Sequence, residues 1–498
     1  MRLNRRTILK TAGLAGAACA FGGPRPARPQ SRHPKFLVVL HGTGGASILD
    51  SLMAVRESEC ANATTLNCFP DNLVHDIDGS PFRAVNQRVE QVAAIPAPYT
   101  SDQKSFVEAH KDELMVATWT RTSVNHLVGQ RRAVTGNEAW QGRTLQELVA
   151  EQHGAGFLLP NVHLSSGTGF NERGTDDGLR PSSYGEAVSD PGLWPLALSG
   201  SKGLARAVRP KLIQHARSVR DGVLDPRSAF FQTFGESPRI GRWLANRGDK
   251  ARQIEQAGLI DQLFFLSESD AYPLSEFGLS PSPSARVVQD AFPNASTDPL
   301  EAQAALAFLL LKYRVSVSVT LGPSASATFE EGVDLSGGAI PEGGLVNPPI
   351  AFDFSHQGNR SVQAMMWDRV FGIAARLKRL LKNEEMDDGS SMWDHTLLYF
   401  ATDFGRTKQR PENAPEFGTG HDLNNAVVFL SPLVNGNRIL GGLDPDTGLT
   451  HGFDPVTGEP APDRHMTEAQ IFSGICSTLG LDLGGSGLPP VPAMRKGA

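Results

Sequence analysis

Short apolar runs alternate along the chain with longer amphipathic segments. The runs are rich in Val, Leu, Phe and Thr, which is typical of strands buried on both faces of a sheet; they lie at 35–45, 113–120, 161–166 and 395–402. Apolar residues recur at helical spacing in other segments, at 123–136, 144–154 and 359–383. Residues 298–322 have the pattern of a helix followed by a strand, and 425–432 that of a last strand. This order predicts an α/β fold with a mostly parallel central sheet and helices on both faces.

The first thirty residues have the pattern of a targeting signal and a linker. Arg5 and Arg6 precede a mildly apolar stretch that ends in Ala18-Cys19-Ala20, and a proline-rich segment follows. This layout is typical of a twin-arginine export signal cut after Ala20, although Cys19 leaves a lipoprotein signal as the alternative. We therefore expect the twin-arginine export machinery to recognise the chain and deliver it to the periplasm or beyond.

The remaining residues, 31–498, are expected to form a single domain. The segment 167–290 is rich in Gly, Pro and Ser, and we expect it to be an insertion that caps the sheet. A chain of 498 residues with 40% hydrophobic content can bury a large core. Its net charge of −6 gives no reason to propose nucleic acid or an anionic membrane as a partner. After residue 30, no stretch of the sequence is long and apolar enough to span a bilayer.

Three cysteines lie outside the predicted signal. Cys60 and Cys68 flank a short polar loop and could form a disulfide in an oxidising compartment. Cys476 lies in an apolar segment with helical spacing and is expected to be a buried apolar residue. Neither a zinc knot nor a nucleophile is indicated by their spacing.

Polar residues gather where several predicted strands end. Asp403 and Arg406 follow the strand at 395–402, while Asp353, His356 and His421 lie in loops next to other elements. Ligands bind outside the carboxyl ends of strands in open α/β sheets. Imidazoles together with a carboxylate suit a divalent metal ion such as zinc. The alternative for Asp403 is a plain strand exit with a helix-capping aspartate.

Five short motifs occur together in one order, and they carry a resemblance to a known family. They are "GGASILDSL" (44–52), "TSVNHLVGQ" (122–130), "DFSHQGN" (353–359), "TDFGRT" (402–407) and "GTGHD" (418–422). Over nearly the whole chain after the signal, they resemble the exported bacterial family called domain of unknown function 1501, which is related to sulfatases and alkaline phosphatases. The resemblance implies an alkaline-phosphatase-like fold and metal-dependent hydrolysis of a phosphate or sulfate ester. The expected substrate is an anionic small molecule or polymer.

The resemblance also implies roles for individual residues. Asp353, His356 and His421 resemble the ligands of the first metal position in the alkaline-phosphatase-like superfamily. Asp403 resembles a ligand of the second position, where Phe404 replaces the usual histidine. Asp50, in the turn after the first strand, is a further candidate ligand. The metal ion could be zinc, calcium or another divalent ion.

Three mechanisms are open for the reaction. His126 stands at the position of the sulfatase nucleophile and could form a phosphoryl- or sulfo-histidine, or act as a metal ligand. Ser123 or Thr122 could attack instead, with Arg121 or Arg406 and the helix dipole holding the anion. In the third mechanism a metal-activated water attacks directly.

Ser47, Arg121 and Asn125 are expected to contact the substrate. A binding or assembly protein that keeps the fold without turnover is the alternative function, and Phe404 favours it. Asp403 is expected within a few ångströms of His126, His356 or His421. Replacing Asp403 by Asn is expected to abolish turnover with little effect on stability.

Overall fold

The computed structural model describes residues 33–198 except 93–94 and 166, separate stretches within 211–277, and residues 279–323 and 351–497. Pro34–Ala498 form one compact unit. The predicted export signal and linker at 1–30 lie outside the described residues, so both stay predictions.

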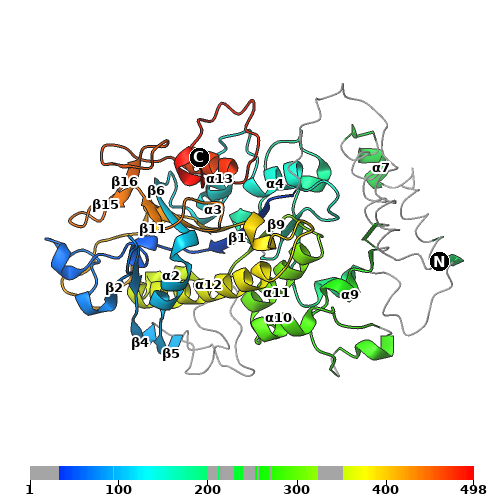
Figure 1. The fold of residues 1–498 in the computed structure, drawn as a ribbon, viewed down its shortest axis with the longest axis horizontal. Helices are drawn as coiled ribbons and strands as arrows, with labels where there is room; N and C mark the ends of the chain where they lie inside the picture. The colour runs from blue at the N-terminus through cyan, green and yellow to red at the C-terminus, as the bar shows by residue number, and fades with distance from the viewer. Residues whose placement is uncertain are drawn as a thin grey trace. The chain divides into compact units, whose positions relative to one another are not determined.

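The described strands build an eight-stranded central sheet (Figure 1). Its order across the sheet is β14 (Arg438–Leu440), β6 (Leu114–Thr120), β13 (Asn424–Leu430), β10 (Thr396–Thr402), β1 (Phe36–Gly42), β9 (Ser318–Leu321), β7 (Asn161–His163) and β8 (Glu186–Ala187). Strand β13 runs antiparallel to both of its neighbours. The other strand pairs of this sheet are parallel. The predicted α/β class with a mostly parallel sheet is confirmed.

The prediction that the strand at 425–432 is the last one is wrong. The chain continues from β13 to β14, which pairs with β6 at the edge of the sheet. Only three residues of β14 join the sheet, and such a short segment has no clear strand pattern in the sequence.

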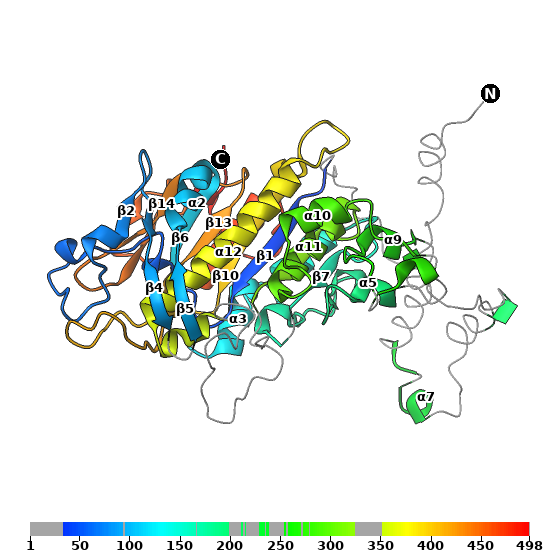
Figure 2. The ribbon, with the colours of Figure 1, turned by 90° about the horizontal axis from the view of Figure 1, so that it is seen from below.

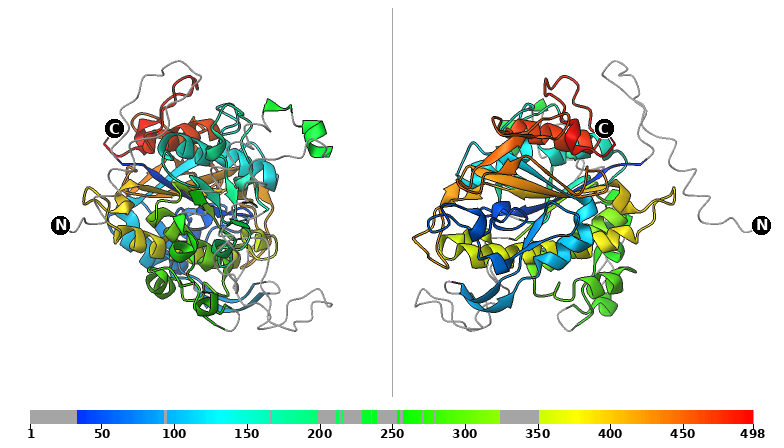
Figure 3. Two further views of the ribbon diagram at one scale, coloured as in Figure 1. Left: turned by 90° about the vertical axis from the view of Figure 1, so that its right-hand side faces the viewer. Right: turned by 60° about the vertical axis from the view of Figure 1, so that its left-hand side comes forward.

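Helices cover both faces of the sheet (Figure 2 and Figure 3). On one face lie α12 (Asn359–Lys382), α11 (Pro299–Lys312), α2 (Gln103–His110) and α10 (Ala285–Ala291). On the other lie α3 (His126–Thr135), α4 (Leu145–His153) and α13 (Glu468–Thr478). Because neither face meets water, Phe36 to Leu40 of β1 are all completely buried.

Shorter elements connect these layers. The described ones are β2 (Val74–Asp76), β3 (Arg83–Val85), β4 (Arg88–Val92), β5 (Ile95–Thr100), β11 (Gly405–Arg406), β12 (His421–Asp422), β15 (Gly442–Leu443), β16 (Thr450–Phe453), β17 (Pro460–Ala461), α5 (Trp194–Ala197), α7 (Ala229–Phe234) and α9 (Ile260–Leu263). Within 167–290, β8 pairs with β7 at the sheet edge. The role of this segment as a cap stays a prediction.

Local signals in the sequence determine where α3 and α4 begin and where α3 ends. Asn125 precedes α3, and its side chain accepts a hydrogen bond from the backbone N–H of Val128. Thr144 and Glu147 form a reciprocal capping box at the start of α4. Gly136 ends α3 with φ of 63°, a left-handed conformation that favours glycine.

Cys60 and Cys68 form no disulfide in this structure, although their spacing in the sequence allows one. Cys60, Cys68 and Cys476 are free, buried thiols. Burial and a hydrogen bond with Cys60 raise the pKa of Cys68 to about 12. Cys476 is completely buried, as expected.

Among the described residues, no helix combines the length and the apolar character needed to cross a bilayer.

Candidate metal centre

The site lies where several strands meet at one edge of the sheet. β6, β1 and β10 are mutually parallel in direction, so their carboxyl ends share this edge, and the antiparallel β13 begins there. His126 is the first residue of α3, which follows β6. Asp353 and His356 lie in a single-turn 3-10 helix, Phe352–His356, and His421 begins β12.

Four side chains converge at this edge. One ligand atom from each of His126, Asp353, His356 and His421 lies within 4.8 Å of the others. The Nε2 atoms of His356 and His421 are 2.9 Å apart. Oδ1 of Asp353 lies 3.3 Å from Nε2 of His126 and 3.5 Å from Nε2 of His356. Three imidazoles and one carboxylate are a donor set suited to zinc or a similar divalent ion.

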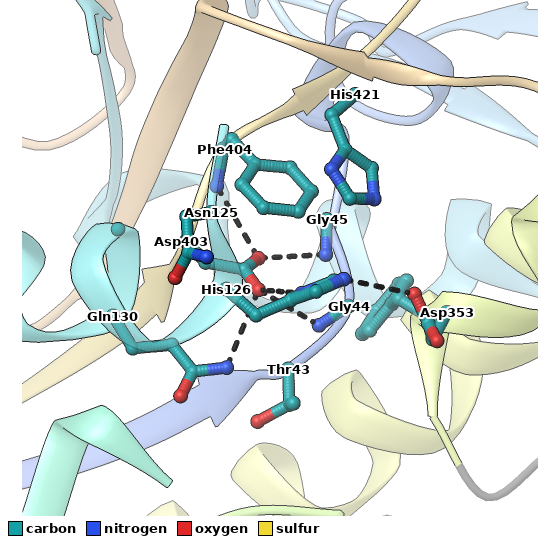
Figure 4. Close-up of polar contacts among 12 residues, drawn as sticks. Thr43, Gly44, Gly45, Asn125, His126, Gln130, Asp353, Asp403, Phe404 and His421 are labelled. Carbon is teal, nitrogen blue, oxygen red and sulfur yellow. Dashed lines mark hydrogen bonds and ion pairs between the residues drawn. The ribbon is translucent and has the colours of Figure 1, made fainter. Parts of the chain in front are cut away.

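The other ring nitrogens of two histidines are held from behind. Nδ1 of His126 lies 2.9 Å from Oδ2 of Asp403 (Figure 4). Nδ1 of His421 lies 2.7 Å from the carbonyl oxygen of Val124. A carbonyl only accepts, so Nδ1 of His421 carries the proton and Nε2 of the neutral ring carries the lone pair. Metal-binding histidines commonly donate their second ring N–H to a carboxylate or carbonyl in this way.

The facing nitrogens of His356 and His421 give a test of whether a cation fits. Nη1 of Arg406 can only donate and lies 3.3 Å from Nε2 of His356, a contact that suits the tautomer in which this Nε2 is an acceptor. Nε2 of the neutral His421 is also an acceptor, because the proton of this ring is on Nδ1, which donates to the carbonyl of Val124. Two acceptor nitrogens 2.9 Å apart repel each other unless a proton or a cation lies between or beside them. The geometry therefore fits a bound metal ion.

Asp403 is held in a cradle of donors. Its completely buried carboxylate accepts hydrogen bonds from Gly44 N (3.1 Å), Gly45 N (2.7 Å) and Phe404 N (3.2 Å). Nε2 of Gln130 lies 3.4 Å from the same group. Burial raises the pKa of Asp403, but the hydrogen bond with His126 and those from the glycines outweigh it, so the pKa is below its ordinary value. The carboxylate is therefore charged at neutral pH.

The glycine turn after β1 needs its glycines. Gly44 and Gly45 have φ of 96° and 79°, a region that other residues rarely adopt. A Cβ on Gly44 would lie 2.2 Å from the backbone nitrogen of Asp353. This turn therefore brings two N–H groups to Asp403 while leaving room for the turn that carries Asp353.

The charges around His126 show that a positive charge is favourable at this point. Hydrogen bonds with Asp353 and Asp403 raise the pKa of His126 to about 9. The hydrogen bond with His126 lowers the pKa of Asp353 to about 2. Burial lowers the pKa of both His356 and His421, and nearby Arg406 adds to this effect. The latter two histidines are therefore neutral at pH 7, the form that binds metals.

Arg406 is completely buried and ties several loops together. Nη2 lies 3.4 Å from Oδ1 of Asp353 and 3.3 Å from the carbonyl oxygen of Phe352, and it also donates to the carbonyl of Gly44. Its charged partner is Asp353 and not Asp403. The predicted contact of Arg406 with a substrate anion stays a prediction.

Arg121 is buried behind the site. Its Nε donates to the carbonyl oxygen of Asp403 at 2.9 Å, and its guanidinium lies 3.4 Å from Glu468 and 4.1 Å from the ring centre of Trp119. These contacts fix the end of β10 from behind. The predicted contact of Arg121 with substrate stays a prediction.

Ser123 and Asn125 lie in the turn that leads into α3. Oγ of Ser123 accepts a hydrogen bond from the backbone N–H of Asn125 at 3.1 Å, and the Asn125 side chain caps the helix. The roles predicted for both in catalysis or substrate binding stay predictions.

The structure places Ser47 and Asp50 in a separate polar group. Nζ of Lys408 lies 3.2 Å from Oγ of Ser47 and 3.0 Å from Oδ1 of Asp50, and Asn67 also donates to Asp50. Asp50 is therefore not among the four converging residues, although a ligand role was expected for it. Asp403, which was also expected as a metal ligand, is not one of the four converging residues either. It contacts one of them, His126, from behind.

Gln130 and Lys408 were missed by reasoning from the sequence. Gln130 lies one helical turn after His126 on α3, so its position on the same helix face was a usable signal. Lys408 follows the "DFGRT" motif and gave no signal. Nor could the sequence show that the backbone carbonyl of Val124 orients His421.

Phe404 forms an apolar wall of the site. Its completely buried ring is stacked on His421, with centroids 4.1 Å apart, and lies 4.8 Å from the ring of His126. Phe404 therefore packs against the rings of two of the converging histidines.

No protein-family model matches the chain, and no curated protein sequence matches it. Among solved structures, it is similar to a 2-O GAG sulfatase, with 8% identity, a TM-score of 0.32, and coverage of 93% of this chain and 74% of that one. It is also similar to the phosphonate monoester hydrolase SpPMH from Silicibacter pomeroyi, with 8% identity, a TM-score of 0.31, and coverage of 93% and 76%. A third is Ps i-CgsB in complex with k-i-k-neocarrahexaose, with 9% identity, a TM-score of 0.29, and coverage of 92% and 75%. TM-scores this low carry no weight for activity, and the resemblance to the domain of unknown function 1501 family stays a prediction.

Proposed function

We propose that the protein is an exported, metal-dependent hydrolase of a phosphate or sulfate ester. The observation that carries the proposal is the convergence of His126, Asp353, His356 and His421 within 4.8 Å, with acceptor nitrogens facing each other. Export is proposed from Arg5 and Arg6 and the apolar stretch that follows them.

A divalent ion bound by these four residues would act as a Lewis acid toward the ester oxygen and lower the pKa of a bound water. The residues of the chain prepare the site for it. Asp403 holds the imidazole of His126 with Nε2 toward Asp353, and the Val124 carbonyl holds His421 in the matching tautomer. Arg406 keeps the turn that carries Asp353 against the glycine turn.

The geometry favours a ligand role for His126 over a nucleophilic one. Both of its ring nitrogens face carboxylates, at 2.9 Å and 3.3 Å. The raised pKa keeps His126 protonated in metal-free protein, and a metal ion that displaced the Nε2 proton would occupy the lone pair that direct attack needs. Ser123 Oγ accepts a hydrogen bond from a backbone N–H, and among the described residues it makes no hydrogen bond with a base. We therefore propose attack by water on phosphorus or sulfur, with the ester oxygen leaving as an alcohol after it takes up a proton.

Metal content and turnover of purified protein test this proposal. We expect a bound divalent ion by elemental analysis, and hydrolysis of aryl phosphates or aryl sulfates that stops after chelation. His356→Ala and His421→Ala should lose both, while His75→Ala, a histidine change on β2, should keep both. A protein that binds no metal under any loading condition would contradict the proposal.

A binding or assembly protein that keeps the fold is the second candidate. Phe404 favours it, because its buried ring packs against His421 and His126 at the position where the superfamily that the sequence resembles has a further histidine ligand. Metal binding without turnover of any ester would support this second function.

A further inference from the structure

Four exposed aliphatic residues adjoin, along the chain, two histidines of the candidate metal centre. Val124, Leu127, Val128 and Leu423 are 44%, 53%, 40% and 40% exposed; we name these four the aliphatic rim. The other large hydrophobic residues exposed in the described part of the chain lie outside α3 and outside the segment next to His421; they are Leu193, Leu212, Val287, Leu449 and Val456. Single exposed aliphatic residues are ordinary, but a group beside a site is informative.

Backbone contacts connect the aliphatic rim to the centre. The carbonyl of Val124 accepts the hydrogen bond from His421. Leu127 and Val128 directly follow His126 in the first turn of α3. Leu423 follows the strand that carries His421, and its carbonyl accepts a hydrogen bond from the backbone N–H of Arg121 at 2.7 Å. The rim residues therefore adjoin His126 and His421 through the chain and the backbone, and they come from two separate segments.

We propose that the molecule bound at this centre carries an apolar group, an alkyl chain or an aryl ring, next to its anionic ester group. This inference rests on the proposed function, because the ester group must occupy the centre for its neighbour to reach the rim. The ester end would meet the charged and polar centre, while the apolar end would cover side chains that otherwise stay in water.

The size of the rim favours a small molecule over a protein partner. Four partly exposed aliphatic side chains provide far less than the roughly 800 Å² that each partner of a stable protein complex buries. An anionic membrane surface would need clustered free cations. The arginines of α3 are engaged instead: Arg131 pairs with Glu138 and Glu172, and Arg132 donates to Thr122.

A series of n-alkyl phosphates and n-alkyl sulfates, from methyl to octyl, tests the inference below the micelle concentration. Binding is measured by calorimetry on metal-loaded protein, and hydrolysis is followed separately. Full burial of each added methylene would tighten binding about fourfold, and on an open rim we expect about 1.5- to 2-fold for each. The octyl-to-methyl ratio of affinities should fall toward one in the double variant Leu127→Ser/Leu423→Ser. It should be unchanged in Val287→Ser, an equally exposed aliphatic residue on α10.

Binding and hydrolysis separate the failure of this inference from the failure of the proposed function. Tighter binding of octyl esters that depends on Leu127 and Leu423 supports the inference even if no ester is hydrolysed, in which case only the proposed reaction fails. Equal binding of methyl and octyl esters by the unaltered protein overturns the inference. So does a chain-length effect that survives in the double variant, or a dimer or vesicle complex that the double variant dissociates.

Discussion

Replacing Asp403 by Asn tests the cradle at the end of β10. The substitution keeps the shape of the side chain but removes its charge and replaces one acceptor oxygen by an NH₂ donor. The remaining oxygen can still accept from Gly45 N and Phe404 N, which both face Oδ1. The new NH₂ group would face the donors that now bind Oδ2, which are Gly44 N, His126 Nδ1 and Gln130 Nε2.

The expected cost follows from the two strongest interactions that are lost. Leaving the buried N–H of Gly44 without an acceptor costs about 1–3 kcal/mol. Losing the charge-assisted bond to His126 costs about 1.5–3 kcal/mol more. The free energy of unfolding of metal-free protein should therefore fall by about 2.5–6 kcal/mol, which includes the range of about 3–5 kcal/mol for breaking a buried charged pair. The sequence alone suggested little effect on stability, but Asp403 is completely buried, and that changes the expectation.

Urea denaturation of chelator-treated protein measures this cost. Asp353→Asn is the matched control, because it removes an equal charge beside the same histidine from a side chain that is 51% exposed. The control should lower the free energy of unfolding by less than Asp403→Asn does, because Asp353 is half exposed, even though buried Arg406 loses its charged partner. Metal affinity should fall at least about tenfold in Asp403→Asn, as it does when the group behind a ligand is lost. Equal and small effects of the two substitutions on stability would refute the cradle as described.

Three further predictions concern pH, the glycine turn and export. Because the pKa of His126 is raised from 6.5 to about 9, its contribution to the stability of metal-free protein should be complete below pH 6.5 and lost as pH rises through 9; urea denaturation at several pH values should show this fall, and His126→Gln should flatten it. Gly44→Ala should cost more than the roughly 1–3 kcal/mol of backbone strain alone, because its Cβ would also meet Asp353, whereas Gly156→Ala, with φ of 87° and open space around it, should show the strain alone in the same assay. Replacing Arg5 and Arg6 by Lys should leave precursor in the cytoplasm on fractionation, and unchanged export would exclude a twin-arginine signal.

The central strands and the polar residues at their ends could be predicted because each leaves a local pattern. The apolar runs of β1, β6 and β10 are long enough to identify buried strands. His356 and His421 stood next to predicted elements, and the structure brings both to the same edge of the sheet.

Other features depend on contacts between distant segments, and no local pattern records them. An apolar strand such as β13 has the same pattern in either direction, so its antiparallel course could not be predicted. The buried pair of Arg121 with Glu468 joins β6 to a helix near the other end of the chain. Asp50 has the residue type of a ligand, but Lys408, which the sequence gave no reason to place there, is its partner.

The reversed direction of β13 has a consequence for the way this molecule can evolve. β10 ends and β13 begins at the same edge, so the connection that carries Arg406, Lys408 and His421 never crosses the sheet. An insertion in a parallel crossover would displace a helix that covers the sheet, whereas one in an exposed part of this connection need not displace such a helix. Doubling the length of a flexible loop costs only about 0.6 kcal/mol. Lineages of this fold can therefore diversify the surroundings of the centre while inheriting the same interior.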